Sequence, residues 1–442
     1  MKKAALHNLG CKVNAYETEA MQQMLEEDGY EIVSFQEQAD VYVINTCSVT
    51  NIADRKSRQM LRRAKKLNPD SIVVAAGCYV QTSSEEIKKD LSVDIIIGNN
   101  KKHELISMIQ NFKQEKLKEN RDKEEWNPVL EGMIDINTSQ EYEKMSIHRT
   151  AEHTRAFIKV QDGCNQFCSY CIIPYARGRV RSRSMADILE ETTTLSNNGY
   201  QEIVLTGIHL SSYGVDNQHS LLELIQEVHK IEGIKRIRLG SLEPKIITEP
   251  FVKEIAKLYK VCPHFHLSLQ SGCDDTLKRM NRQYTCEEYK NGCELLRKYY
   301  EHPAITTDVI VGFPGETEEE FEKTREFLKD IAFYEVHIFK YSKRKGTKAA
   351  DMKEQVDEGI KTKRSNSLFQ DTDEMKREFI SWYEDKTVEV LLEEEVFVDN
   401  EAYFGGYTKN YVKAMIKKPG NVKNEIVKSL VCRTEKDHLL LS

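Results

Sequence analysis

Three closely spaced cysteines, Cys164, Cys168 and Cys171, restrict what this chain can fold into more than any other feature of its sequence. They form a CxxxCxxC run just after the predicted first strand of a βα series that begins at Ala156. Zinc sites usually take four protein ligands from CxxC pairs or from histidines at set spacings, and no matching second pair follows. Iron–sulfur cubanes usually take four cysteines, so three thiolates would leave one iron open. The run favours a cubane cluster, with a structural zinc site as the alternative.

A second group of cysteines lies in the first hundred residues. Short apolar runs alternate there with helical patterns, which is typical of a doubly wound α/β domain. Strands are predicted at residues 3–9, 41–45, 72–76 and 94–97. Three of them end in a small-residue turn and a cysteine, namely Cys11, Cys47 and Cys78. Because parallel strands end at one edge of the sheet, we expect the three sulfur atoms to converge. The alternative is that each is a small buried apolar side chain.

The length of 442 residues predicts several domains. Residues 1–112 form the amino-terminal α/β domain, and the polar stretch 113–149 is interpreted as a linker with a turn at Asn127-Pro128 and a hairpin-like edge at 133–136. Residues 150–378 alternate predicted strands and helices, which favours a partial TIM-like (β/α) barrel. Residues 379–442 carry short β-rich runs and predict a small all-β barrel.

Composition excludes several classes of protein. The 11 cysteines are an odd number in a chain without a secretory signal, which argues against a disulfide framework and for thiolate chemistry. No stretch approaches the roughly 18 uninterrupted apolar residues of a membrane helix, so we expect no membrane association and a cytoplasmic location. The formal net charge of -7 leaves any nucleic-acid binding to local patches.

The CxxxCxxC run in a partial βα barrel resembles the signature of radical S-adenosylmethionine (SAM) enzymes, in which SAM chelates the open iron. With three strand-end cysteines before it and a small β domain behind, the chain resembles the methylthiotransferases over essentially its whole length. This resemblance implies two 4Fe-4S clusters, one on each cysteine trio, and a carboxy-terminal TRAM domain. It also places SAM near strand-end residues that can approach or hydrogen-bond a ligand. These are Tyr170, Gly207, Ser241, Glu243, Gln270 and Gly312, for each of which a structural role is the alternative.

Two sequence strings resemble one subgroup of these enzymes. NLGCKVNAYET, which contains Cys11, and PYARGRVRSR, which follows the core cysteines, are similar to the subgroup that acts on threonylcarbamoyladenosine in tRNA. That nucleoside carries a carboxylate, and a guanidinium can bind a carboxylate bidentately. We therefore expect Arg177 or Arg179 to hold it. The alternative is that these arginines contact tRNA phosphates or internal carboxylates.

Two basic patches are candidate RNA contacts. Residues 55–66 hold seven positive and no negative charges on a predicted helix, including Arg58 and Arg62. A solvated helix usually mixes signs, so this one favours phosphate. The run FGGYTKNYVKA, which includes Lys409 and Tyr411, resembles the TRAM core, where bases can stack on aromatic rings while lysines follow the backbone. A soluble β domain with a lysine-rich exterior is the alternative.

By resemblance, the reaction uses two SAM molecules: one methylates a sulfur of the first cluster, and the other gives a 5'-deoxyadenosyl radical at the second. The methylthio group then moves to carbon 2 of the adenosine 3' of the anticodon, an unactivated position that no ordinary side-chain base could deprotonate. The resemblance implies the tRNA anticodon stem-loop and an electron donor such as flavodoxin or ferredoxin as partners of a monomer. The rivals are methylthiotransferases acting on isopentenyladenosine or a ribosomal-protein aspartate, and a non-catalytic metal-containing RNA-binding protein.

Overall fold

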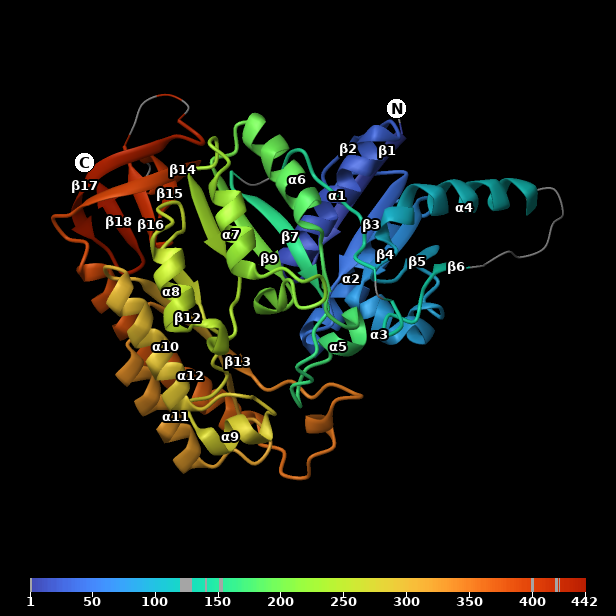
Figure 1. Cartoon of the computed structure of the whole chain (residues 1–442). Helices are drawn as coiled ribbons and strands as arrows, with labels where there is room; N and C mark the ends of the chain where they lie inside the picture. Colours follow the sequence, from blue (N-terminus) through green and yellow to red (C-terminus); the bar gives the residue numbers. More distant parts are fainter. Residues whose placement is uncertain are drawn as a thin grey trace.

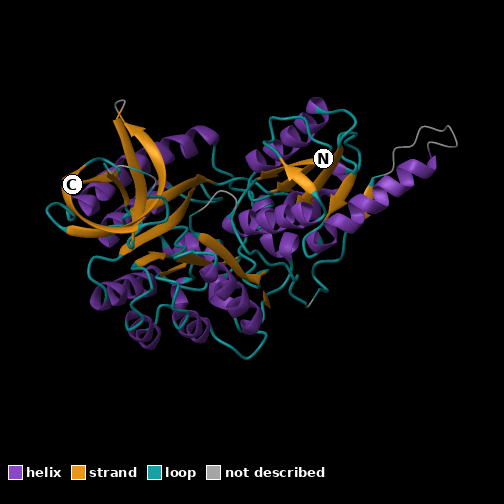
Figure 2. Cartoon of the chain, turned by 90° about the horizontal axis from the view of Figure 1, so that it is seen from above, coloured by secondary structure: helices purple, strands orange, loops and turns teal. Residues whose placement is uncertain are grey.

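The computed structural model describes residues 2–119, 129–139, 141–150, 154–398, 401–417, 420 and 422–442. Three units follow one another along the chain. The amino-terminal α/β unit and the carboxy-terminal β-barrel lie at opposite ends, with the second βα unit (the core) between and below them (Figures 1 and 2). In the described residues no helix is both long and apolar enough to cross a membrane.

The amino-terminal unit is a parallel sheet in the order β2-β1-β3-β4-β5-β6. Its central strands β3 and β4 are buried along their whole length, as expected for a parallel sheet covered on both faces. Its elements are β1 (Lys2–Asn8), α1 (Lys12–Glu27), β2 (Tyr30–Ile32), β3 (Val41–Thr46), α2 (Asn51–Leu67), β4 (Ile72–Gly77), α3 (Cys78–Ile87), β5 (Ile95–Ile97), α4 (Leu105–Glu119) and β6 (Leu130–Gly132).

The core is an open, partial barrel made of two sheets, β10-β9-β7-β8 and β11-β12-β13, which isolated bridges such as Leu242–Leu267 connect. All its strand pairs are parallel except β7 with β8. Its strands are β7 (Ala156–Asp162), β8 (Arg181–Ser182), β9 (Glu202–Gly207), β10 (Arg236–Leu239), β11 (His264–His266), β12 (Ala304–Val311) and β13 (Glu335–Lys340).

Helices cover the outside of this sheet. Three of them begin with a capping box, as at Thr317 and Glu320 of α11, which satisfies the first free backbone N–H groups. The helices are α5 (Ile173–Arg177), α6 (Met185–Asn197), α7 (Leu221–His229), α8 (Glu249–Ala256), α9 (Asp274–Arg279), α10 (Cys286–Tyr299), α11 (Glu318–Ile331) and α12 (Glu358–Ser381).

The carboxy-terminal unit is a closed barrel in the order β14-β15-β16-β18-β17. Closure leaves no free sheet edge. Its interior shares an apolar cluster with Tyr334 before β13 and with Ile380 of α12, so the barrel is packed onto the core rather than tethered to it. Its strands are β14 (Thr387–Val398), β15 (Glu401–Thr408), β16 (Lys413–Ile416), β17 (Ile426–Thr434) and β18 (His438–Leu441).

The predicted linker differs from the structure in two respects. The strand expected at 133–136 as a hairpin-like edge lies instead at Leu130–Gly132, where it pairs parallel to β5 and extends the amino-terminal sheet. The segment at 141–150 is packed against both neighbours, because Tyr142 donates to the Lys159 carbonyl and the Gln23 amide donates to the Arg149 carbonyl. The Asn127-Pro128 turn lies outside the described residues.

Candidate iron–sulfur and substrate site

Cys11, Cys47 and Cys78, here called the amino-terminal triad, follow three adjacent strands of one sheet. Cys11 caps α1 after β1, Cys47 follows β3 and Cys78 begins α3 after β4. Gly10, at φ +115°, lies so close that an added Cβ would be 3.0 Å from the Cys47 sulfur. Burial and the charges of Cys78 and Cys11 raise the pKa of the Cys47 thiol to about 12. Cys78 and Cys11 thus lie within electrostatic range of Cys47 at one edge of the sheet, and their sharing of a cluster stays a prediction.

Nitrogen donors surround the Cys78 sulfur. The Arg177 Nε lies 3.3 Å from it and the Asn99 Nδ2 lies 3.6 Å from it. Both donors and the thiol are buried. A neutral thiol is a weak acceptor, whereas a metal-bound thiolate accepts such hydrogen bonds well, and bound metal deprotonates the thiol. These residues fit an anionic sulfur ligand at this position.

Arg177 belongs to a buried ion network between the amino-terminal unit and the core. Glu17 of α1 accepts from Arg177 at 2.8 Å, from Lys159 at 2.7 Å and from Lys102 at 3.1 Å. Asp162 at the end of β7 also pairs with Arg177 and Lys159. All five side chains are at most 2% exposed. Arg181 also lies 3.8 Å from Asp162, so four cations face these two carboxylates, and one of the cations, Arg177, lies beside the Cys78 sulfur.

This network corrects one of the two assignments made for the substrate carboxylate. The Arg177 guanidinium is fully buried and already bound to Glu17, Asp162 and Asn14. It is therefore not free to bind a substrate. Arg179 is exposed and its guanidinium lies over the Phe167 ring at 4.4 Å, within the loop of the core cysteines.

Cys164, Cys168 and Cys171, here called the core triad, lie on the loop between β7 and α5. Arg282 donates to the Cys168 sulfur at 3.2 Å, and the Gln166 backbone N–H donates to the Cys164 sulfur at 3.5 Å. Burial, with the charge of Cys168, raises the pKa of Cys171 to about 12. Again nitrogen donors point at the sulfur atoms, which suits metal-bound thiolates.

A cavity of about 200 Å³ lies beside Cys171 of the core triad. Val49 and Thr50, which follow Cys47, line it together with Cys171, so segments from both units form its walls. Its other lining residues are Tyr170, Ile172, Ile173, Gln270, Asp308, Ile310, Phe339, Lys340, Tyr341 and Ser342. The cavity is polar at a few points and apolar elsewhere, which is usual for sites that bind small molecules.

Two of the residues predicted for SAM meet at this cavity, Tyr170 and Gln270. Gln270 has φ 72°, a strained value for a residue other than glycine. Tyr341 was missed by the sequence reasoning, although its hydroxyl is buried and has no hydrogen-bond partner among the described residues. A ligand in this cavity would supply one. Asp308 was missed as well, and nothing in the DVIVGFPGE string distinguishes it as a site residue.

The other residues predicted for SAM lie elsewhere. Glu243 is close enough to Cys164 to affect the pKa of that thiol, and it is bound to Gln166 at 3.0 Å and to His209 at 3.2 Å. Ser241 is exposed. At Gly207 and Gly312 a Cβ would lie within 2.8 Å of Gln161 or Lys361. Close packing thus already accounts for both glycines.

Lys12, which follows Cys11 directly, is exposed to solvent, and charged groups of the core lie within electrostatic range of its ammonium. Desolvation, together with the charges of Arg238 and Arg155, lowers the pKa of Lys12 to about 8, and Asp308 opposes this effect. Lys12 thus lies within electrostatic range of a residue that lines the cavity beside Cys171.

The predicted RNA contacts are divided between surface and interior. Arg62 is exposed, whereas Arg58 donates to the Tyr79 hydroxyl at 2.7 Å. Tyr411 is the clearest difference, because Arg155 and Arg238 lie over its ring at 4.9 and 4.7 Å at the junction of barrel and core. It is therefore not a free stacking platform for a base.

Lys409 lies at the same junction. Its carbonyl accepts from Arg238 at 2.9 Å. Its ammonium is partly exposed and lies 3.8 Å from Glu389. The Lys409 backbone therefore helps to hold the barrel on the core, and its charge remains partly open to solvent.

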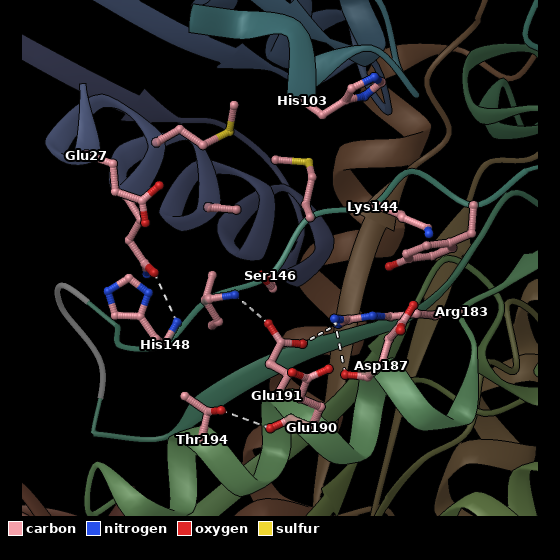
Figure 3. Close-up of a pocket in the computed structure, with 16 residues that line it drawn as sticks. Glu27, His103, Lys144, Ser146, His148, Arg183, Asp187, Glu190, Glu191 and Thr194 are labelled. Carbon is pink, nitrogen blue, oxygen red and sulfur yellow. Dashed lines mark hydrogen bonds and ion pairs between the residues drawn. The ribbon is translucent and has the colours of Figure 1, made fainter.

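A second cavity, of about 520 Å³, lies between α1, α6 and the segment at 142–148 (Figure 3). Arg183 and Glu191 form an ion pair within it, and the Ile147 backbone N–H donates to Glu191. None of the six cysteines is among the described residues that line it. We do not assign this cavity to the cysteine site.

Comparison with known proteins places this geometry in a family. Residues 158–328 match the radical SAM superfamily, and residues 3–98 match a family described as "Uncharacterized protein family UPF0004". A solved radical S-adenosylmethionine methyltransferase, TsrM from Kitasatospora setae, shares the fold with a TM-score of 0.58 and 15% identity over 79% of this chain and 77% of that one. The chain is a member of the radical SAM superfamily.

Curated relatives narrow this class. The chain is 42% identical to the threonylcarbamoyladenosine tRNA methylthiotransferase MtaB of Bacillus subtilis, over 97% of this chain and 93% of that protein. It is 42% identical to MtaB of Aquifex aeolicus, with 91% and 95% covered, and 36% identical to a tRNA-2-methylthio-N(6)-dimethylallyladenosine synthase of Alkaliphilus oremlandii, with 92% and 86% covered. The chain therefore belongs to the radical SAM tRNA methylthiotransferase family.

Proposed function

We propose that this enzyme adds a methylthio group to carbon 2 of N6-threonylcarbamoyladenosine in tRNA, 3' of the anticodon. One observation supports this most directly: Val49 and Thr50, which follow Cys47, line one cavity together with Cys171 of the core triad. A sulfur donor and a radical source can then act on one base held between them. The two MtaB relatives favour the threonylcarbamoyl substrate over the dimethylallyl one, because they are more similar to this chain.

The amino-terminal and core triads are proposed to hold one 4Fe-4S cluster each, with SAM beside the core triad. When bound, these groups supply the sulfur atom, the electron, the methyl group and the radical, which no side chain can provide. Tyr170, Gln270 and Tyr341 line the cavity and are proposed to hold SAM there, since the Tyr341 hydroxyl has no hydrogen-bond partner among the described residues. Glu243, Ser241, Gly207 and Gly312 remain predicted contacts.

Buried charge in the chain prepares both cluster sites. Arg177 and Arg282 each donate to a cysteine sulfur, and a cluster with thiolate ligands is anionic, so both hydrogen bonds stabilise it. The ion pairs of Glu17 hold Arg177 in position and also connect the amino-terminal unit to the core. Apolar side chains such as Ile173 and Ile310 line the cavity and help to exclude water, which protects a reactive intermediate.

The partners of the reaction are part of the same proposal. Exposed basic residues of α2, among them Arg62, together with Arg179 and Lys409, are proposed to contact the anticodon stem-loop, and the terminal barrel is proposed to be a TRAM domain. A flavodoxin- or ferredoxin-type donor would reduce the core cluster. The protein is proposed to act as a cytoplasmic monomer.

Mass spectrometry of tRNA nucleosides tests the substrate assignment. Expression in a host lacking the modification should convert threonylcarbamoyladenosine to its 2-methylthio form and leave isopentenyladenosine unchanged. A triple Cys→Ala variant of the core triad is the control and should give no product. Methylthiolated isopentenyladenosine would support the second candidate, whereas no methylthio product from an iron-loaded enzyme would contradict the proposal.

A further inference from the structure

We infer that Lys12 binds the carboxylate of the threonylcarbamoyl group and is a specificity-determining residue of the site. This inference rests on the proposed function and assigns the carboxylate contact to a residue on the amino-terminal unit.

Lys12 is the first residue of α1 and the chain neighbour of a ligand in the amino-terminal triad. Helix α1 packs against β7 and β9 of the core. Asp308 of β12 lies within electrostatic range of the Lys12 ammonium and also lines the cavity beside Cys171. Lys12 is thus the chain neighbour of Cys11 and lies within electrostatic range of a residue that lines the cavity beside Cys171.

Two other cations in this region are already neutralised. Arg238 pairs with Glu202 at 2.8 Å, and Arg155 pairs with Glu393 at 2.6 Å. Within the part of the chain that the structure describes, no carboxylate lies within ion-pair distance of Lys12. Of the three cations Arg238, Arg155 and Lys12, Lys12 is therefore the one without a direct ion-pair partner, and a bound anion would pair with its ammonium.

Asp308 does not fill that role in the structure. Its Oδ2 lies 3.2 Å from the His266 Nε2, and the other ring nitrogen of His266 lies 3.0 Å from the Thr306 hydroxyl. The carboxylate is thus oriented toward the histidine. A ligand carboxylate could approach Lys12 from the cavity without breaking this pair.

The chemistry of the substrate explains why the contact should lie here. Carbon 2 and carbon 6 of adenine both flank N1, so a substituent on N6 lies on the same edge of the ring as the methylthio acceptor. The residue that binds the N6 substituent must therefore lie near the amino-terminal cluster, which is proposed to deliver the sulfur atom. Lys12 meets this condition because it follows Cys11, whereas Arg179 lies over Phe167 on the core loop.

The test uses the iron-loaded enzyme and two anticodon stem-loops that differ in one group. One carries the threonylcarbamoyl free acid and the other its carboxamide. Wild-type enzyme should prefer the acid by about 10- to 100-fold in kcat/KM, the range of a hydrogen bond between charged partners. Lys12→Gln should reduce this preference to about threefold or less, mainly through KM, and Lys12→Arg should retain most of it. Arg179→Gln removes the other candidate for the carboxylate contact, and it should weaken binding of both stem-loops alike and leave the preference unchanged.

Iron content and visible absorbance of each variant show whether the neighbouring cluster is still loaded. If Lys12→Gln loses its cluster, binding of the two fluorescent stem-loops to the same protein gives the acid-to-amide ratio without turnover. An acid preference that persists in Lys12→Gln, or one that Arg179→Gln abolishes, would overturn the inference. A wild-type enzyme that is inactive on the acid stem-loop would instead contradict the proposed function.

Discussion

Glu17→Gln is expected to weaken the seam between the amino-terminal unit and the core. The glutamine keeps the size of the side chain but leaves Arg177 and Lys159 with Asp162 as their ion-pair partner, and it leaves Lys102 with none among the described residues. Removing one partner of a buried ion pair typically costs about 3–5 kcal/mol, because an uncompensated charge stays buried. Three cations lose contacts here, so we expect a loss in that range and a decrease on the order of 10 °C in the first thermal transition.

Glu27→Gln is the matched control, since Glu27 is an exposed residue of the same helix. Unfolding should be followed anaerobically by circular dichroism, with attention to the first transition because a chain of several units need not unfold in one step. Equal transition temperatures for the two variants would refute this reasoning. Loss of iron from Glu17→Gln should accompany its destabilisation, because Arg177 also donates to Cys78.

The pH dependence of this effect has a defined sign. Burial alone would raise the pKa of Glu17, but the charges of Arg177, Lys102 and Lys159 outweigh it and hold the pKa well below its ordinary value. A carboxylate with a lowered pKa in the folded state contributes stability above its unfolded pKa of about 4.3 and loses it as the pH falls through the folded value. The difference between wild type and Glu17→Gln should therefore be constant from neutral pH to about pH 6 and shrink only in acid.

Three further predictions concern the core cluster, the barrel and the RNA surface. Arg282→Met should lower the midpoint potential of the core cluster by tens of millivolts, because it removes a hydrogen bond to a ligand sulfur. An EPR-monitored redox titration measures this potential, and an unchanged value would contradict the prediction. Tyr411→Ala should release the carboxy-terminal barrel to limited proteolysis, whereas Tyr403→Ala on the barrel surface should not; equal cleavage would contradict the packing. Arg55→Gln with Lys56→Gln should weaken tRNA binding and reduce its salt dependence by about two phosphate contacts, and an unchanged salt slope would exclude this surface.

Local sequence signals predicted the scaffold well, and they are also the basis of the predicted metal ligands. Cys11, Cys47 and Cys78 each follow a strand with clear apolar runs, and parallel topology then requires their convergence. The CxxxCxxC run is likewise local, because its spacing along one loop determines which side chains can share a cluster. Such features depend on neighbours a few residues away.

Residues whose roles depend on distant partners were not predictable in this way. Arg177 is bound to Glu17, 160 positions earlier, and nothing near either residue indicates the pairing. The sequence around Tyr411 has the composition of an RNA-binding barrel, yet the Tyr411 ring faces Arg155 and Arg238 of the core. The strand at 130–132 was misplaced by a few residues because its register is set by β5, an element across a long connection.

The central claim is that two cysteine triads hold two iron–sulfur clusters near one shared cavity. Anaerobic iron analysis with EPR of the reduced protein tests it most directly, using the wild type and the triple Cys→Ala variant of each triad. We predict about eight irons in the wild type and about four in each variant, with spin coupling between clusters in the wild type alone. Eight irons in either variant, zinc in place of iron, or two uncoupled signals in the wild type would contradict it.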